Sequence, residues 1–308
     1  MAVLSKEDYQ YLYDIYQSEG IAKVPHCVYL EQILQNPAAK TFYQYAGVSS
    51  ETLASSDGET DAEEPVEPSD FYVSSPAEGV AYLHLSSFDT KLLDSDVPGL
   101  INFFKEIGDC NACIVDIRGN PGGSTLYWRR GIVEPNLCGK VSVSSIEMVR
   151  GKACKDYLQK DGVVLHPAAR LDRAKYPDLN LTDFMRMQDY IESSESFQPL
   201  QDAPLFQGDF YVLIDEGVYS AAEAFAYFCK ETRFSTLVGA RTAGDGIGID
   251  PLIFVLPNSG ICYRFSASLG LNSDGASNEE YGTEPDVSCD AKDALKVCLK
   301  TIQEKAVA

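Results

Sequence analysis

Two short apolar runs constrain the fold of this chain more than any other feature. The segments "NACIVDI", residues 111–117, and "GDFYVLI", residues 208–214, are apolar at most positions and do not alternate with polar residues. Such runs are typical of strands that are buried on both faces, as in a parallel sheet. A helical pattern at residues 97–107 precedes the first run, and another, beginning near Ser220, follows the second. This order of elements predicts an α/β fold.

The segments around these runs complete the predicted core. In "GVAYLHLSSF", residues 79–88, polar and apolar residues alternate, which predicts a strand with Ala81, Leu83 and Leu85 on one face and Tyr82 and His84 on the other. Further predicted elements are a short strand at 235–239, a hairpin at 253–268 that turns at 257–260, and a last helix at roughly 291–304.

The N-terminal part of the chain has a different composition from the core. Helical patterns occur at residues 5–19, 27–35 and 38–45, which predicts a small helical region over 1–53. Residues 54–75 are acidic and rich in serine and proline, so we expect a linker there. The predicted core then covers residues 76–308, with a polar insertion at about 128–205.

Charge and cysteine content exclude several classes of function. The 308 residues carry a net charge of −21, which argues against a nucleic-acid partner. No apolar run is long enough to span a membrane, and the N-terminus lacks the blocks of a signal peptide. The nine cysteines cannot all pair within the chain, and only Cys110 and Cys113 have C-x-x-C spacing, so we expect free thiols and no metal site.

Each buried run is followed by a turn that could carry chemistry. In "DIRGNPGGS", residues 116–124, three glycines allow the backbone to aim N–H groups at an anion, although no phosphate-binding motif is present. In "EGVYSAAEAF", Ser220 stands at the start of the predicted helix. Taken alone, this serine is more simply explained as a helix cap than as a nucleophile.

The two turns together resemble peptidase family S41, which includes the carboxyl-terminal processing (tail-specific) proteases, the tricorn core and retinoid-binding-protein-like modules. The resemblance covers most of residues 76–290 and includes the later segments "LVGARTAGDGIG" and "DGASNEEYGTEPDV". It implies a ClpP/crotonase-like ββα spiral core, a serine peptidase acting on a peptide or protein substrate, and no cofactor. It also implies that Ser220 is the nucleophile.

The resemblance also suggests the rest of the catalytic residues. Processing proteases use a lysine in T-x-G-K-G, but here the segment is "TAGDGIG", with Asp245 in place of the lysine. The tricorn-like branch implies a histidine type instead, with His84 as base and Glu279, or else Glu280, as its acidic partner. Leu83 departs from that branch, which has a serine before the histidine. The oxyanion hole is expected from the N–H of Gly122 or Gly123 and that of Ala221.

Two further expectations concern the whole protein. Residues 1–75 leave no room for the PDZ domain that processing proteases carry, so a preference for substrate C-termini is only an analogy. The alternative to an active peptidase is an inactive S41-like module that binds a peptide or an apolar ligand, an interpretation that the missing lysine favours. The sequence does not determine the oligomeric state or the compartment; the family resemblance points outside the cytoplasm, whereas the cysteines weakly favour a reducing environment.

Overall fold

The computed structural model describes residues 2–6, 9–10, 36–45, 71–160, 162–249 and 251–307. By the contacts among its residues the chain divides into two compact units. The first consists of Met1–Val66, Lys152–Val164 and Ile249–Ser268, and the second of Glu67–Gly151, Leu165–Gly248 and Leu269–Ala308. Within the described ranges no helix is long and apolar enough to cross a membrane.

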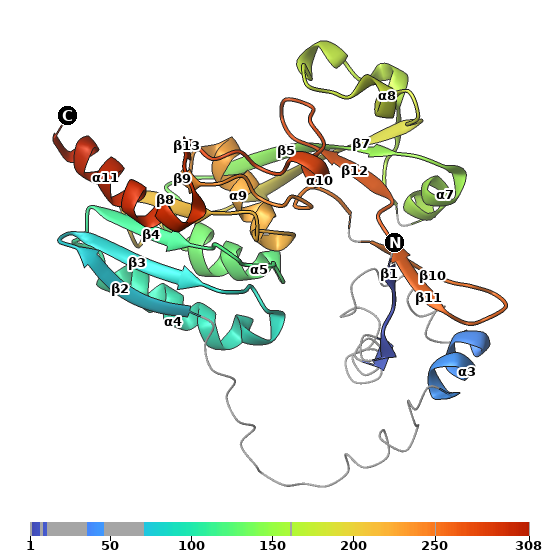
Figure 1. Cartoon of the computed structure of the whole chain (residues 1–308), viewed down its shortest axis with the longest axis horizontal. Coiled ribbons are helices and arrows are strands. Elements are labelled where there is room, and N and C mark those ends of the chain that lie inside the picture. The colour runs from blue at the N-terminus through green and yellow to red at the C-terminus, as the bar shows by residue number, and fades with distance from the viewer. Residues whose placement is uncertain are drawn as a thin grey trace, which may run out of the picture. The chain divides into compact units, whose positions relative to one another are not determined.

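The second unit is built on a six-stranded sheet in the order β13-β9-β8-β4-β3-β2 (Figure 1). All neighbours in this sheet are parallel except β2, which pairs antiparallel with β3. The two apolar runs form the central strands β4 and β8, which explains why neither alternates. The strands are β2 (Phe71–Ala77), β3 (Val80–Leu85), β4 (Ala112–Asp116), β8 (Asp209–Ile214), β9 (Thr236–Gly239) and β13 (Val287–Ser288).

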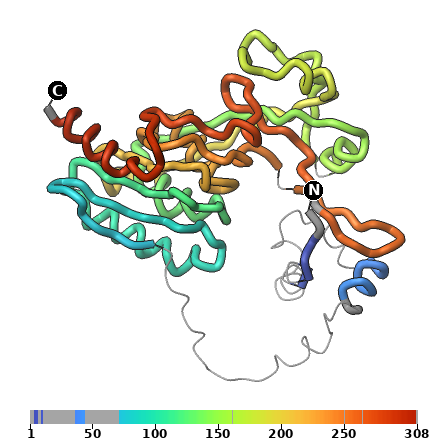
Figure 2. Tube along the Cα trace, viewed as in Figure 1, coloured from blue at the N-terminus to red at the C-terminus, as the bar shows by residue number. Residues whose placement is uncertain are grey.

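Helices cover both faces of this sheet. On one face Leu83, Val115 and Val212 belong to the same buried core as residues of α4 (Leu93–Glu106) and α9 (Ala221–Thr232). On the other face Tyr82 and Leu213 pack with α11 (Ala294–Val307), the red C-terminal helix in Figure 2. The alternation along β3 is confirmed, because Leu83 and Tyr82 belong to these two different cores.

The insertion supplies most of a second sheet, in the order β12-β5-β7-β6. Its strands are β5 (Val141–Val149), β6 (His166–Pro167), β7 (Asp189–Phe197) and β12 (Ser268–Leu271), and β5 and β7 pair antiparallel over their whole length. Short helical segments lie between the strands and longer helices of both sheets: η3 (Thr90–Leu92), α5 (Thr125–Trp128), η4 (Arg129–Val133), α6 (Glu134–Asn136), η5 (Ala168–Arg170), η6 (Arg173–Lys175), α8 (Leu181–Phe184), α10 (Asn278–Tyr281) and η7 (Ala291–Asp293).

The first unit contains the predicted hairpin. Strands β10 (Leu252–Val255) and β11 (Cys262–Phe265) pair antiparallel, and β1 (Ala2–Val3) adds to β11. Helix α3 (Pro37–Tyr45) confirms the third predicted N-terminal helix, and α7 (Lys152–Lys160) comes from the insertion. The hydroxyl of Tyr43 donates to the carbonyl of Leu4 at 3.1 Å, which ties α3 to the N-terminal strand segment.

The structure corrects the predicted N-terminal boundaries. The linker predicted over 54–75 is wrong for its last residues, because Phe71–Ala77 form the strand β2. This strand lies at the edge of the sheet and is little buried, so its sequence has no apolar pattern. Residues 54–70, the helix predicted at 27–35 and most of the helix predicted at 5–19 lie outside the described residues. The N-terminal segment belongs to one unit with parts of the insertion and the hairpin, so it does not stand alone.

Candidate active site

Ser220 occupies a strained turn between β8 and α9. Its backbone has φ 55° and ψ −121°, a conformation that residues with a side chain rarely adopt and that costs on the order of 1–3 kcal/mol. Its side chain makes no capping hydrogen bond to α9, whereas a capping serine accepts one from the first turn. The turn therefore has the features of a strand-to-helix elbow that exposes a hydroxyl, and not those of a simple helix cap.

Backbone hydrogen bonds from three segments hold this turn. The N–H of Ser220 donates to the carbonyl of Gly244 at 3.2 Å, and the N–H of Ala224 donates to the carbonyl of Ser220 at 2.9 Å. The N–H of Tyr219 donates to the carbonyl of Asn120 at 3.2 Å. The strained residue is thus fixed by contacts with both the glycine turn and the "TAGDGIG" segment.

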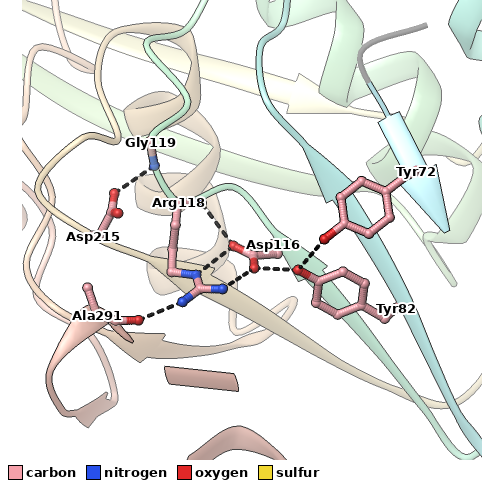
Figure 3. Close-up of polar contacts among 7 residues, drawn as sticks. All are labelled: Tyr72, Tyr82, Asp116, Arg118, Gly119, Asp215 and Ala291. Carbon is pink, nitrogen blue, oxygen red and sulfur yellow. Dashed lines mark hydrogen bonds and ion pairs between the residues drawn. The ribbon is translucent and has the colours of Figure 1, made fainter. Parts of the chain in front are cut away.

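Side-chain contacts hold the glycine turn against the serine turn. Asp215, directly after β8, accepts the N–H of Gly119 at 2.8 Å through its Oδ1 (Figure 3). The same oxygen accepts the N–H of Gly217 at 2.9 Å. Asn120 is completely buried; its Nδ2 donates to the carbonyl of Leu85 at 3.0 Å and its Oδ1 accepts the N–H of Gly122 at 2.9 Å. Asp215 thus links the two turns, and Asn120 holds the glycine turn to the residue at the end of β3.

Gly122 makes the closest approach to the serine. A Cβ at this position would lie 2.7 Å from the Tyr219 carbonyl oxygen, 2.8 Å from the Ala221 nitrogen and 2.9 Å from Ser220 Cβ. The N–H of Gly122 already donates to Asn120. Of the two neighbouring glycines, Gly122 and Gly123, it is therefore not the one with an unengaged N–H. Across the described residues, the N–H groups of Gly123 and Ala221 donate to no other group. These two N–H groups are therefore unengaged, as the donors of an oxyanion hole have to be.

A buried polar network lies behind the glycine turn, and sequence reasoning missed it. Asp116, at the end of β4, accepts the hydroxyl of Tyr82 at 2.6 Å and the Nε of Arg118 at 2.9 Å (Figure 3). Arg118 also donates to the carbonyl of Ala291 at 2.6 Å. Burial and then the bond to Asp116 raise the pKa of Tyr82, and the same carboxylate raises the pKa of Arg118. The D-x-R spacing in "DIRGNPGG" was the available signal.

Glu223, also missed from the sequence, is completely buried in the first turn of α9. Its Oε1 accepts the Nδ2 of Asn278 and the hydroxyl of Thr283, each at 2.7 Å. Burial raises the pKa of Glu223, because the loss of solvent outweighs the hydrogen bonds that favour its charged form. The side chain connects the helix that begins beside Ser220 with the segment of residues 278–283.

Glu279 and Asp245 are neighbouring carboxylates at this site. Burial raises the pKa of Glu279, and the negative charges of Asp245 and Glu280 raise it further. Asp245 has a positive φ of 63° and accepts a hydrogen bond from the hydroxyl of Tyr219, the residue before the serine. A Cβ on Gly244 would lie 3.2 Å from the Cα of Glu279, so the two segments are in direct contact.

The combination of a glycine turn and a serine elbow at the ends of adjacent parallel strands agrees with the family comparison. A model of peptidase family S41 matches residues 79–289. The chain belongs to peptidase family S41. Among curated protein sequences, none matches the chain significantly.

Several solved structures are similar to this chain at low sequence identity. A Parabacteroides merdae protein assigned as a peptidase aligns with a TM-score of 0.53 at 19% identity, covering 82% of this chain and 68% of that chain. Mature CPAF aligns at 0.49 and 20% identity, with 73% and 50% covered. The photosystem II D1 C-terminal processing protease aligns at 0.46 and 16% identity, with 74% and 50% covered. This S41 chain therefore spans about half the length of the last two proteins.

The structure does not join His84 to the serine of this S41 core. His84 lies on the same face of the sheet as Tyr82, and its ring stacks on Tyr72 with 4.9 Å between centroids. Helix α9 covers the opposite face. No hydrogen bond between described residues connects the imidazole with Ser220 or with Glu279. The position of His84 on a strand could be predicted from the sequence, but its surroundings could not.

The predicted site residues thus separate into two groups. Ser220, Ala221 and the glycine turn come together, and Glu279 lies beside Asp245 in the neighbouring segment. His84 forms the second group: it lies near the carboxyl end of β3, paired in register with Asp116, and its ring stacks on Tyr72. Asp245 stands where the processing proteases of the family have a lysine. It lies beside the serine turn, because the N–H of Ser220 donates to the carbonyl of Gly244, the residue before Asp245.

Proposed function

We propose that the protein is a serine peptidase in which Ser220 is the nucleophile. The observation that carries this proposal is the strained Ser220 elbow with the backbone of Gly122 packed against the N–H of Ala221. A residue with a side chain is kept at φ 55° only where its surroundings impose that conformation, and such strain is concentrated at functional sites. Membership in peptidase family S41 supports the same chemistry.

The proposed reaction is acyl transfer to the serine. The Ser220 oxygen attacks a peptide carbonyl carbon, and the N–H groups of Gly123 and Ala221 donate to the oxygen that becomes negative. A general base takes the hydroxyl proton and returns it to the leaving amine as the C–N bond breaks. Water then attacks the acyl-enzyme by the reverse proton path and frees Ser220.

The family resemblance assigns the general base to His84 and its partner to Glu279. In the structure His84 stacks on Tyr72 and makes no hydrogen bond to Ser220, so this proposal requires the contact to form when substrate binds. Catalytic hydrogen bonds commonly shorten on binding. Of the other two histidines, His166 lies on β6 and His26 lies outside the described residues. All three are therefore varied in the test.

The test is covalent labelling with a fluorophosphonate, read by intact mass. One adduct is expected on the wild-type chain and none on Ser220→Ala. His84→Ala should reduce the labelling rate at least roughly a hundredfold, a typical contribution of a general base, whereas His166→Ala should not change it. A labelling rate of His84→Ala equal to wild type would remove His84 from the mechanism, and a large loss in His26→Ala would assign the base to that residue.

The alternative is an inactive S41-like module that binds a peptide or an apolar ligand. Two observations favour it: Asp245 replaces the expected lysine, and no described base is hydrogen-bonded to Ser220. Peptide binding by a folded chain that neither labels nor cleaves would establish this function in place of the first. Processing of substrate C-termini is a further proposal by analogy with the processing proteases of the family, and the products of cleavage would test it.

A further inference from the structure

A cavity of about 450 Å³ lies in the second unit beside the C-terminal half of α9. It is lined by residues within 227–231 of α9, within the turn 272–277 after β12, and within α10 and the segment that follows it. Its volume is within the range of about 300–1,000 Å³ that ligand pockets occupy. Ser220, His84 and Glu279 do not line it, so it is separate from the proposed catalytic residues.

The exposed side chains of this cavity are mainly carboxylates. Five acidic residues line it and all of them are exposed: Asp178, Glu231, Asp274, Glu280 and Glu284. A backbone hydrogen bond brings two of them together, because the N–H of Asp178 donates to the carbonyl of Asp274 at 2.9 Å. Like charges that are held near one another repel, and a cation bound between them offsets that repulsion.

The two basic residues that line the cavity do not neutralise this charge. The Nζ of Lys230 lies 2.6 Å from Oδ1 of Asp286, which is not part of the lining, and Arg241 pairs with Glu284 at 3.8 Å. The other four acidic residues of the lining have no ion-pair partner in the described part of the chain. The cavity therefore has a net negative charge, which favours a cationic ligand.

Two tyrosines in the lining add aromatic surface beside the carboxylates. Tyr227 is buried; burial raises its pKa, and the negative charges of Glu231 and Asp274 raise that pKa further. Tyr281 is half-exposed, and the guanidinium of Arg241 already lies 6.0 Å from the centroid of its ring. Because the face of an aromatic ring attracts cations, these side chains favour a flat cation over a neutral group.

A buried hydroxyl at this cavity has no hydrogen-bond partner of its own. Ser277 lines the cavity and is only 9% exposed, and among the described residues its Oγ makes no hydrogen bond. Buried hydroxyl groups are nearly always hydrogen-bonded, because burial without a partner costs free energy. An N–H group of a ligand would supply that partner. This observation is independent of the acidic residues, and it too indicates a ligand that donates hydrogen bonds.

We propose that this cavity binds the arginine side chain of a peptide substrate, at a position remote from the scissile bond. The exposed carboxylates pair with the guanidinium, and the hydroxyl of Ser277 accepts one of its N–H groups. Arginine fits this arrangement better than lysine, because its planar guanidinium has five donors in fixed directions and packs on aromatic rings. The inference rests on the proposed function, since it needs a peptide bound at Ser220, and it names the substrate class.

The position of the cavity along α9 sets the distance between this arginine and the scissile bond. Tyr227 and Glu231 follow Ser220 by seven and eleven residues, which is roughly 10 and 16 Å along a helix that rises about 1.5 Å per residue. An extended peptide advances about 3.3 Å per residue, so the arginine is about three to five residues from the scissile bond.

Binding is measured on the Ser220→Ala protein, which cannot form an acyl-enzyme, by the fluorescence anisotropy of labelled peptides. Two otherwise uncharged peptides of the same sequence differ at one position, arginine or citrulline; citrulline keeps the shape of the side chain and removes its charge. The arginine peptide should bind at least roughly tenfold more tightly, about the effect of one hydrogen bond to a charged group. Equal affinities of the two peptides would overturn the proposal.

A matched pair of double variants, both made in the Ser220→Ala protein, tests the location of binding. Asp178→Asn with Glu231→Gln removes two carboxylates that line the cavity, whereas Glu106→Gln with Asp109→Asn removes two exposed carboxylates that do not. At about 0.15 M salt, charges are screened beyond about 8 Å, so only the first variant should reduce the arginine preference, to below about threefold. Equal losses in both variants, or no loss in the first, would overturn the assignment of the cavity. Circular dichroism confirms that both variants are folded.

Free arginine amide distinguishes a peptide from a small cation as the ligand. As a competitor it should bind at least roughly tenfold more weakly than the arginine peptide, because it lacks the contacts of the peptide backbone. Equal affinity would assign the cavity to a free guanidinium compound and overturn the inference about the substrate.

The cleavage pattern separates this inference from the proposed function. Wild-type protein is incubated with a library of synthetic peptides of varied sequence, and the cut sites are determined by mass spectrometry. Cuts with arginine enriched about three to five residues away support both proposals, whereas cuts without this enrichment support the peptidase and contradict the inference. A chain that binds the arginine peptide through the cavity but neither cuts peptides nor reacts with a fluorophosphonate contradicts the peptidase alone.

Discussion

The glycine turn allows backbone strain and side-chain clash to be tested separately. Gly119 and Gly122 lie in the same turn and both have positive φ, 74° and 99°. A Cβ on Gly119 would meet no atom within 4 Å, whereas one on Gly122 would meet three atoms of the serine turn below 3.0 Å. Substitution of alanine at each position is therefore a matched pair, in which only the second disturbs Ser220 directly.

The expected magnitudes follow from these distances. Gly119→Ala should lower the free energy of unfolding by about 1–2 kcal/mol, the cost of a left-handed conformation for a residue with a side chain. Gly122→Ala carries the same cost, and its Cβ must also move from 2.7 Å to an ordinary contact of 3.4 Å from the Tyr219 oxygen. The atoms it meets are backbone atoms and a Cβ, so no side-chain rotation can relieve the contact. A shift of about 0.7 Å in the serine turn should reduce reactivity on the order of tenfold to a hundredfold.

Urea unfolding and the rate of fluorophosphonate labelling measure the two effects independently. Gly119→Ala should be less stable than wild type and label at nearly the wild-type rate, and Gly122→Ala should be both less stable and slow to label. Circular dichroism before labelling confirms that each variant is folded. The reasoning would be refuted by a Gly122→Ala rate within about threefold of wild type, or by an equal loss of rate in both variants.

Three further predictions concern the carboxylates. Glu279→Gln should lower kcat on the order of tenfold or more if Glu279 orients the base, and an unchanged kcat would remove it from the site. Asp245→Lys should not raise activity, because the mechanism proposed here does not use an amine at that position; a gain over wild type in peptide hydrolysis would contradict it. Burial raises the pKa of Glu223, so this carboxyl group keeps its proton to a higher pH in the folded state than in the unfolded state. The free energy of unfolding of the wild type should therefore fall as the pH rises from below the ordinary carboxyl pKa through the raised one. Glu223→Gln should lose that part of the pH dependence, and parallel urea-unfolding curves of the two proteins against pH would contradict the prediction.

The sequence by itself determined the local features of this protein. Continuous apolar runs predict β4 and β8 because a strand covered on both faces has no polar side, and the structure confirms both. The glycines of the first turn and Ser220 of the second are recognisable because positive φ and helix starts restrict residue type locally. The edge strand β2 was missed because its side chains are mostly exposed and give no apolar pattern.

Only the tertiary structure decided which groups meet. The N–H of Gly122 donates to Asn120, whereas no such bond engages the N–H of Gly123 among the described residues; spacing does not reveal this difference between neighbouring glycines. His84 is placed on the face of the sheet opposite α9, and Glu223 is buried by partners 55 and 60 residues away in sequence. The physical reason is the same in each case: hydrogen bonding and burial depend on groups that are distant along the chain, and local patterns contain no information about them.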